Sequence, residues 1–434
     1  MDKMADVLGR AGAWCGQNKY LSAIKNAFQN FMPLTIAGAI GVLWCNVLVN
    51  ESTGLGIFFK PIMALEFLNP AFQAVNFCTI SCITVGITLG IAQEIGVWNM
   101  GAEKAGYIPG LVGLAAWLSV TNTSHMVEGA KEAFTGIAGN ELGATGLFTG
   151  MIIGVLSVEL FCFFEKQDAL KIKMPEQVPP GVARAFEVLV PATITLIITA
   201  CIGSACYNLT GLYLNDVIKN GIQGPLGAVG ATVPGVMIIY LVIMLFWLVG
   251  IHGNNMLSAV KEALFTPLAL ENVEKFNKGE KPTNIINMYF LQMCGEFGGS
   301  GVTIGLVIAI IIFGKREDNK AIASLSLVPG LFNINETVTF GVPMVLNPIL
   351  GIPFVVAPLI TIIIGYVLTV IGFCPVACLT VPWTTPPIVF GFLACGANVM
   401  GAVTQAILIV VSTVIYTPFL ISYEKYQNKQ AAEA

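Results

Sequence analysis

The stretch PGLFNINETVTFGVPMVLNPILGIP, residues 329–353, decides how the C-terminal half of this chain must fold. It places one carboxylate, Glu336, among asparagines and apolar residues in sequence that is otherwise hydrophobic enough for a membrane interior. A charge at bilayer depth costs at least ~2.5–3.5 kcal/mol unless it is neutralised, paired or facing a water-filled cavity. The four prolines and the polar NINE core also interrupt any simple helix. Glu336 is therefore a candidate functional residue at a helix break.

The composition of the whole chain indicates an all-α polytopic membrane protein. It is 56% hydrophobic and 11% charged, with a mean hydropathy of +0.80. A helix of about 20 apolar residues crosses the hydrocarbon core, and such stretches recur along the chain. The predicted spans are 30–50, 74–96, 107–121, 145–164, 186–207, 226–250, 351–373 and 397–421. We expect residues 1–20 to form an amphipathic segment on the membrane surface. The net charge of -4 offers no basic face for nucleic acid.

Lys and Arg residues set the predicted orientation, because positively charged loops stay in the cytoplasm. They gather in the loops 165–185 and 252–282 and in both terminal segments. We therefore expect the N- and C-termini to be cytoplasmic. The charged residues used in this assignment are Lys3, Arg10, Lys19, Lys25, Lys166, Lys171, Lys173, Arg184, Lys261, Lys275, Lys278, Lys281, Lys425 and Lys429.

Two interrupted elements are expected in the C-terminal half. Only about 33 residues separate Lys281 from Lys315, which is too few for two full spans of about 20 residues. A re-entrant helical hairpin near 284–314 fits, with its apex at the glycine-rich CGEFGGSG, and a second near 321–348 would break at NINE. A glycine-rich packing crossover followed by an ordinary bent helix is the alternative. We place the divider between an N-terminal region, 1–180, and a C-terminal region, 181–434, which contains both interrupted elements.

The polar residues in apolar surroundings suit a neutral, polyhydroxylated ligand. No Lys or Arg interrupts a predicted span and every Asp falls in a loop or terminal segment, whereas a site for an anion usually supplies a cation. Amides, carboxylates and an imidazole form hydrogen bonds with hydroxyl groups, and the face of an indole packs on the apolar face of a sugar ring. The candidates are His252, Asn254, Asn255, Glu296, Asn333, Asn335, Glu336 and Trp383.

Each candidate also has a structural interpretation. His252 can be a helix-end residue bonded to a carbonyl, and Glu296 can cap the backbone of the hairpin. Trp383 can be an interfacial anchor. The phosphate-loop, dinucleotide and zinc-cluster motifs are all missing from the sequence, so we expect no cofactor, no metal and no ATP-driven transport by this chain alone.

The segments NINETVTFGVPMVLNPILGIPF, CGEFGGSGVTIGL, GIHGNN and VPWTTPP resemble the IIC subunit of the bacterial phosphoenolpyruvate-dependent sugar phosphotransferase system. The resemblance is to the lactose, cellobiose and diacetylchitobiose branch and covers essentially the whole chain. It implies ten spanning helices and two re-entrant hairpins in the bacterial plasma membrane. It further implies a homodimer, with dimer contacts in the N-terminal region, 1–180, and the sugar site in the C-terminal region, 181–434. It also implies a permease for a β-linked disaccharide, which is phosphorylated at its 6-hydroxyl by a phosphocysteine on a IIB protein. We expect IIB, and IIA upstream of it, to be separate polypeptides.

The resemblance assigns roles to matching positions of this sequence. Glu336 and His252 form the polar pair at the reactive end of the sugar, with Glu336 as a candidate general base. The expected substrate-binding residues are Asn335, Asn333, Asn254, Glu296, Gly299, Trp383 and Thr384.

Two other hypotheses stay open at this stage. The first is a proton-coupled secondary transporter of a neutral solute, with Glu336 or Glu296 as the proton site. The second is a membrane scaffold without transport, which leaves the interior polar residues unexplained.

Overall fold

The computed structural model describes residues 10, 13–14, 17–51, 56, 59–125, 134–175 and 177–433. The predicted surface segment at 1–20 lies largely outside these residues. Helices make up almost all of the described secondary structure, and a two-residue antiparallel pair, β1 (Ser124–His125) and β2 (Phe134–Thr135), is the exception among the described residues.

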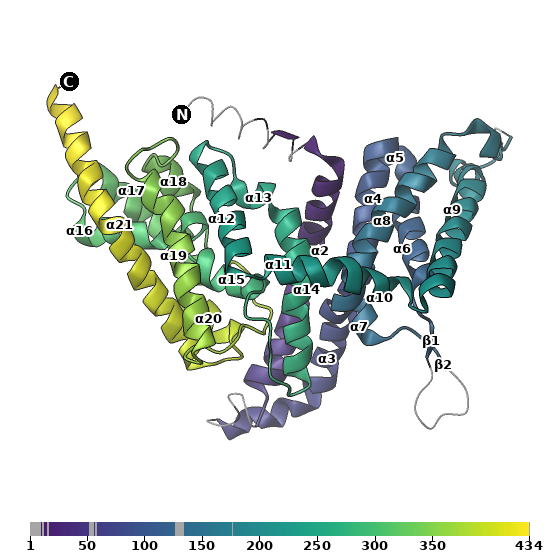
Figure 1. The fold of residues 1–434 in the computed structure, drawn as a ribbon, viewed down its shortest axis with the longest axis horizontal. Coiled ribbons are helices and arrows are strands. Elements are labelled where there is room, and N and C mark those ends of the chain that lie inside the picture. The colour runs from purple at the N-terminus through teal and green to yellow at the C-terminus, as the bar shows by residue number, and fades with distance from the viewer. Residues whose placement is uncertain are drawn as a thin grey trace. The chain divides into compact units, whose positions relative to one another are not determined.

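Each predicted span contains at least one helix, whereas α14 (Ser258–Asn277) lies within the segment predicted as the loop 252–282 (Figure 1). In chain order, the principal helices are α2 (Lys19–Leu43), α3 (Asn69–Cys78), α4 (Ile83–Met100), α6 (Ile108–Val120), α8 (Ala144–Glu165), α9 (Pro180–Thr210), α12 (Val233–Leu248), α14 (Ser258–Asn277), α15 (Met288–Gly295), α16 (Ile304–Phe313), α17 (Glu317–Leu331), α19 (Gly351–Val370) and α21 (Val399–Glu433). The short helices are α5 (Ala102–Ala105), α7 (Gly139–Leu142), α10 (Leu214–Ile218), α11 (Gly224–Gly230), α13 (Gly253–Met256), α18 (Glu336–Gly341) and α20 (Val389–Ala394).

Within the described residues, six helices are long and apolar enough to cross a membrane. A bent pair formed by α15 and α16 passes the same test together, and α6 and α12 are shorter apolar helices. The prediction of an all-α polytopic membrane protein is confirmed.

The chain forms two compact units. The N-terminal unit contains Gln17–Thr35 and Phe77–Ala228, and the C-terminal unit contains Ile36–Asn76 and Val229–Ala434. The predicted division at residue 180 concerns the roles of two regions, dimer contacts and sugar binding, and it stays a prediction.

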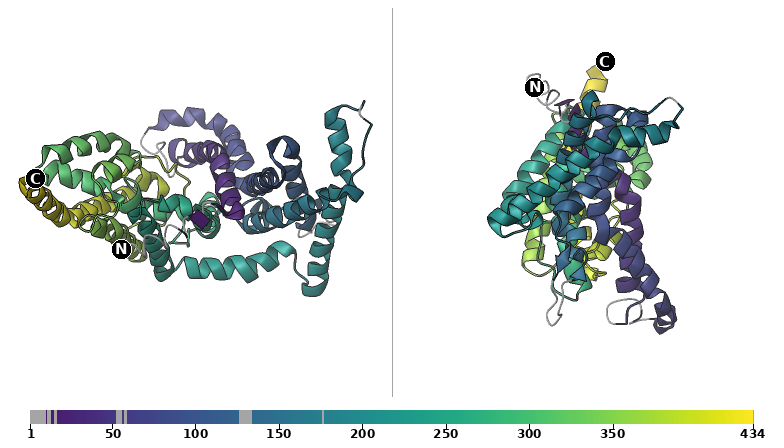
Figure 2. Two further views of the ribbon diagram at one scale, coloured as in Figure 1. Left: turned by 90° about the horizontal axis from the view of Figure 1, so that it is seen from above. Right: turned by 90° about the vertical axis from the view of Figure 1, so that its right-hand side faces the viewer.

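In the N-terminal unit, α4, α6, α8 and α9 pack side by side (Figures 1 and 2). Trp117 of α6 is fully buried in a cluster with Ala116, Val120 and Ile153. The end of α8 carries a buried carboxylate, Glu165, which is 2.9 Å from both Arg184 and Lys104. The charges at this helix end are thus paired.

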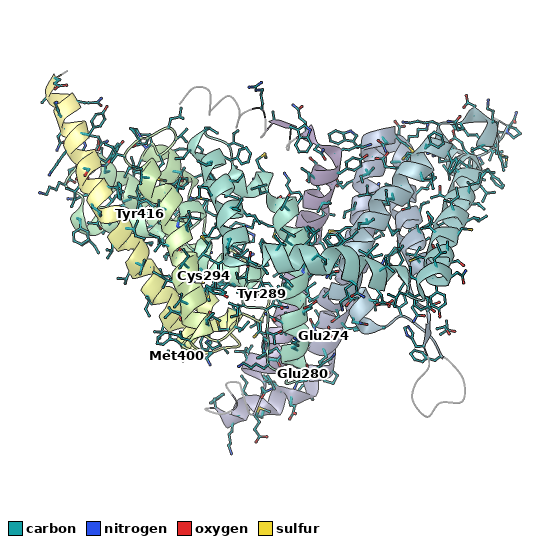
Figure 3. The ribbon with its side chains drawn as sticks, in the orientation of Figure 1. Glu274, Glu280, Tyr289, Cys294, Met400 and Tyr416 are labelled. Atoms are coloured by element: carbon teal, nitrogen blue, oxygen red, sulfur yellow. The ribbon has the colours of Figure 1, made fainter. Side chains whose placement is uncertain are left out.

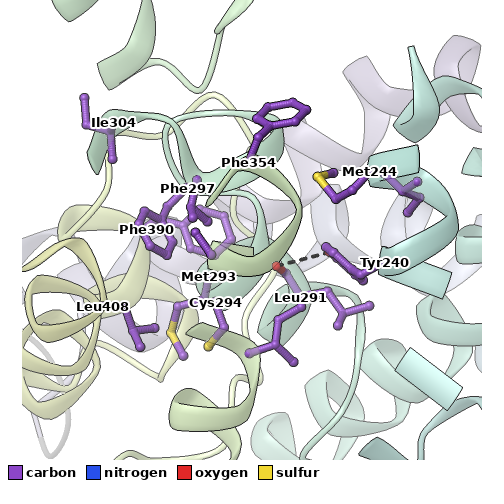
Figure 4. Close-up of a cluster of buried hydrophobic side chains, with 14 of the residues drawn as sticks. Tyr240, Met244, Leu291, Met293, Cys294, Phe297, Ile304, Phe354, Phe390 and Leu408 are labelled. Carbon is purple, nitrogen blue, oxygen red and sulfur yellow. Dashed lines mark hydrogen bonds between the residues drawn. The ribbon is translucent and has the colours of Figure 1, made fainter. Parts of the chain in front are cut away.

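The C-terminal unit is built around α15, which is buried along its length. Tyr240, Phe297 and Phe354 surround it (Figure 4), and α21 runs along α16 and α19. Tyr289 on α15 bonds the hydroxyl of Thr380 at 2.6 Å, and Tyr416 on α21 donates to the carbonyl of Gly301 at 2.7 Å (Figure 3). These buried hydroxyls tie α15 and the segment after it to their neighbours.

The first helix break lies at the glycine-rich segment CGEFGGSG, where the sequence predicted it. Helix α15 ends at Gly295, a short 3₁₀ helix covers Ser300–Val302, and α16 is bent by 59° relative to the preceding part. This bend fits a broken span or a re-entrant loop. Gly298, Gly299 and Gly301 have φ values of +68°, +89° and +77°, which L-residues with a Cβ adopt only under strain.

The second predicted break lies at NINE. Helix α17 ends at Leu331, and α18 begins at Glu336. Asn333, between them, has φ of +63°, a left-handed conformation that asparagine tolerates better than most residues. Both interrupted elements are therefore present, and their breaks face each other through the hydrogen bonds described below.

Gly301→Ala tests how tightly the first break is packed. An added Cβ meets the Phe354 ring and alanine must also adopt φ of +77°. We expect a loss of roughly 2 kcal/mol or more, combining about 1–2 kcal/mol of backbone strain with overpacking. The thermal unfolding midpoint of the purified protein in detergent measures it. Gly372→Ala is the matched control, because its φ is +79° and its added Cβ meets nothing within 4 Å. Equal losses in the two variants would contradict the packing argument.

Candidate functional site

A cavity of about 590 Å³ lies inside the C-terminal unit, between the two helix breaks. Its size is within the range of ligand pockets, roughly 300–1,000 Å³. Nine of the ten candidate residues line it: His252, Asn254, Asn255, Glu296, Gly299, Asn333, Asn335, Glu336 and Trp383. The tenth, Thr384, is absent from the lining, although it adjoins Trp383 in the chain. Residues more than a hundred positions apart thus meet around one space.

His252 and Glu336 face each other across part of this cavity. His252 precedes α13, and its Nδ1 accepts a hydrogen bond from the backbone N–H of Asn255 at 3.2 Å. In the neutral imidazole the proton is then on Nε2, which lies 3.8 Å from Glu336 Oε1. That distance exceeds a hydrogen bond, so both groups retain capacity to bond a third atom between them. The ring of Trp247 packs against the imidazole, with centroids 4.4 Å apart, and holds its orientation.

The side-chain amides of Asn333 and Asn335 join the two breaks. Asn333 Oδ1 accepts from the N–H of Gly298 at 2.6 Å, and its Nδ2 donates to the carbonyls of Trp383 at 2.5 Å and Thr385 at 3.1 Å. Asn335 Nδ2 donates to the carbonyl of Ser300 at 2.7 Å. The amide of Asn333 is thus occupied by backbone groups, which makes it a support for the Trp383 loop.

Lys261 corrects one inference from the sequence. Its charge placed it with other lysines in a cytoplasmic loop, but it lies on α14 with a side chain only 8% exposed, and it lines the cavity. Its Nζ forms an ion pair with Glu296, whose Oε1 also accepts from the Tyr240 hydroxyl at 2.8 Å. The interior therefore does contain a cation. The Glu296 carboxylate neutralises the Lys261 charge. The prediction of a neutral ligand therefore depends on this ion pair, and no longer on the absence of an interior cation.

Several other lining residues escaped the sequence analysis. They are Ser258, Glu262, Gln292, Ser300 and Gln405. Ser258 and Glu262 share one face of α14 with Lys261, at helical spacing. The uncharged run ALFTPLAL, residues 263–270, was the available signal that this segment is a buried helix. Gln405 had no local signal, because it lies in the apolar second turn of the long helix α21.

The family model described as "Phosphotransferase system, EIIC" matches residues 25–358. The chain belongs to this family. It is therefore a multi-pass membrane protein, and membership of the EIIC family implies a sugar substrate and a IIB partner. The prediction of a sugar substrate and a IIB partner is confirmed as far as these two classes of partner.

Individual relatives cover nearly the whole EIIC chain. It is 32% identical to the oligo-beta-mannoside-specific EIIC component of Bacillus subtilis over 98% of this chain and 94% of that one. It is 29% identical to a cellobiose-specific EIIC component of Lactococcus lactis, covering 98% of both chains. Among solved structures it resembles the transporter ChbC, the IIC component of an N,N'-diacetylchitobiose-specific phosphotransferase system, with a TM-score of 0.88. That match has 29% identity and covers 97% of both chains.

Asn333→Asp tests the link between the two breaks in this EIIC protein. Aspartate keeps an oxygen for the N–H of Gly298 but replaces the donor that faces two carbonyls. We expect a loss of about 1–3 kcal/mol in stability and weaker sugar binding, because the Trp383 loop loses its support. Thermal unfolding and sugar titration measure the two effects.

Asn398→Asp is the matched control for that variant. The Asn398 side-chain oxygen accepts from the N–H of Met400, and among the described residues its amide nitrogen donates to no protein group. A normal midpoint and normal sugar binding in Asn333→Asp would contradict the supporting role.

Proposed function

We propose that this EIIC protein binds a β-linked disaccharide and presents its 6-hydroxyl for phosphorylation by a IIB protein. The observation that carries the proposal is the 3.8 Å separation between His252 Nε2 and Glu336 Oε1 at the wall of a disaccharide-sized cavity. The substrates named for the relatives, an oligo-beta-mannoside, cellobiose and N,N'-diacetylchitobiose, support the same substrate class.

Glu336 is suited to act on the hydroxyl. Its side chain is 48% exposed, and no Lys or Arg among the described residues forms an ion pair with it. The carboxylate accepts a hydrogen bond from the 6-hydroxyl and takes its proton as the oxygen attacks phosphorus. The bond between phosphorus and the cysteine sulfur of IIB breaks, a bond from phosphorus to O6 forms, and the sulfur leaves as a thiolate. His252 holds the same oxygen in line through Nε2, so positioning adds to the rate.

The remaining walls suit a sugar ring. Trp383 is exposed in the cavity and offers an apolar face on which a pyranose can pack. Polar groups of Asn254, Asn335 and Glu296 line the same space. Gly299 brings the backbone close to Asn335, since an added Cβ there meets the Asn335 amide carbon at 2.5 Å.

The proposal includes an orientation and an assembly. Cytoplasmic termini follow from the Lys and Arg residues near both ends of the chain. The homodimer, with contacts from the N-terminal region, rests on the resemblance to the lactose, cellobiose and diacetylchitobiose branch. The bound sugar then leaves the site toward the cytoplasm, where phosphorylated IIB meets it.

Glu336→Gln tests the proposed base. Glutamine keeps the size and a hydrogen-bonding oxygen but cannot take a proton, so we expect phosphorylation-coupled uptake to fall about 100-fold or more. Uptake of labelled cellobiose by membrane vesicles that contain IIB, IIA and phosphoenolpyruvate measures the loss. The thermal midpoint should stay near that of the wild type, because the side chain is half exposed.

Glu317→Gln is the control, since Glu317 is an exposed carboxylate on α17 that pairs with Lys320. Near-normal uptake in Glu336→Gln would contradict the proposal. The secondary transporter would be favoured instead if wild-type uptake did not depend on phosphoenolpyruvate and IIB and was lost when the proton gradient was removed.

A further inference from the structure

The buried ion pair between Lys261 and Glu296 lies where three elements meet. Lys261 comes from α14, Glu296 follows α15 at the first break, and the Tyr240 hydroxyl of α12 donates to the same carboxylate oxygen at 2.8 Å. The side chains of Lys261 and Glu296 are 8% and 18% exposed. Two charges at this depth lose much of their hydration, which only close pairing and further hydrogen bonds offset. Stabilisation of the fold alone therefore does not explain why this ion pair is present beside the cavity.

A continuous path of hydrogen bonds leads from this pair to the reactive end of the cavity. Lys261 Nζ also reaches Asn254 Oδ1 at 3.5 Å, and Asn254 Nδ2 donates to Ser300 Oγ at 2.8 Å. The carbonyl of Ser300 accepts from Asn335 Nδ2 at 2.7 Å. Asn254 is two residues after His252, and Asn335 directly precedes Glu336. The path therefore ends beside both members of the polar pair.

We propose that Lys261 is a positioning residue that sets the distance between His252 and Glu336 through Asn254 and Ser300. This inference rests on the proposed function of those two residues. Lys261 anchors α13, which carries Asn254 at its second position, while Ser300 and Asn335 carry the same constraint to the start of α18. The ion pair with Glu296 holds the Lys261 side chain in place, and a charged donor makes stronger hydrogen bonds than a neutral one.

Breaking and replacing the pair have different physical consequences. Lys261→Met leaves the Glu296 carboxylate buried without its cation, which destabilises the fold and also removes the donor to Asn254. Lys261→Met combined with Glu296→Leu removes both charges, and apolar replacement of a buried pair is often neutral for stability. The double variant still has no donor to Asn254. It therefore separates support of the fold from positioning of the site.

The experiment uses full-length purified variants in detergent and two activity readouts. Cellobiose titration counts the binding-competent sites, and the rate of cellobiose phosphorylation by phosphorylated IIB is expressed per bound sugar. We expect Lys261→Met to lower this rate at least 10-fold. We expect the double variant to recover the wild-type thermal midpoint while its rate per bound sugar stays low.

Asn254→Leu tests whether Lys261 acts through the hydrogen bonds of Asn254. It breaks the path at its middle and leaves the ion pair intact, so its rate should fall in the same way. Combined with Lys261→Met it should add little, because both changes interrupt one path. Lys278→Met is the matched control, since Lys278, at the end of α14, is 58% exposed and pairs with Glu274. Its rate should equal that of the wild type.

Three results would overturn the positioning role. These are a wild-type rate per bound sugar in Lys261→Met, full recovery of both stability and rate in the double variant, or additive losses from Asn254→Leu and Lys261→Met. If the wild-type chain itself neither binds cellobiose nor supports its phosphorylation, the proposed function fails instead. The two failures are therefore distinguishable.

Discussion

The C-terminal unit depends on one constraint, which is that backbone groups released at two helix breaks must find partners inside the protein. At membrane depth water does not supply these partners, and each unsatisfied group costs several kcal/mol. Side chains meet the need here. Tyr416 donates to the carbonyl of Gly301, Asn335 to that of Ser300, and Thr303 to that of Gly298 at 2.7 Å. The breaks can therefore lie in apolar surroundings, and the polar groups that satisfy them also shape the cavity wall.

The same constraint explains which parts the sequence predicts well. Apolar spans follow from composition, because length and hydropathy alone decide whether a helix can lie in hydrocarbon. The positions of the breaks follow from local sequence, because glycine, asparagine and proline each disfavour the interior of a helix. Glu336 and His252 were found because a charge and an imidazole in apolar sequence need an explanation. These signals are all local to a few residues, and all but one of the predicted site residues line the cavity.

What the sequence could not give is the set of partners brought together by tertiary packing. Lys261 was misplaced because the charge rule counts lysines near helix ends and cannot recognise one that a distant carboxylate neutralises. Its partner Glu296 lies 35 positions away, on the other side of a helix end and a loop. Gln405 accepts from the N–H groups of Ile388 and Gly391 and donates to the carbonyl of Met293, more than a hundred positions earlier. No periodicity links such positions.

The two interior carboxylates at the breaks show how environment divides their roles. The Oε1 atom of Glu296 accepts a hydrogen bond from the Tyr240 hydroxyl and is paired with Lys261, so protein groups already occupy this carboxylate. The Glu336 side chain is 48% exposed, and the His252 imidazole lies 3.8 Å from it. The protein therefore occupies one of the two carboxylates and leaves the other open to the cavity. This asymmetry supports Glu336, rather than Glu296, as the carboxylate proposed to meet the sugar hydroxyl.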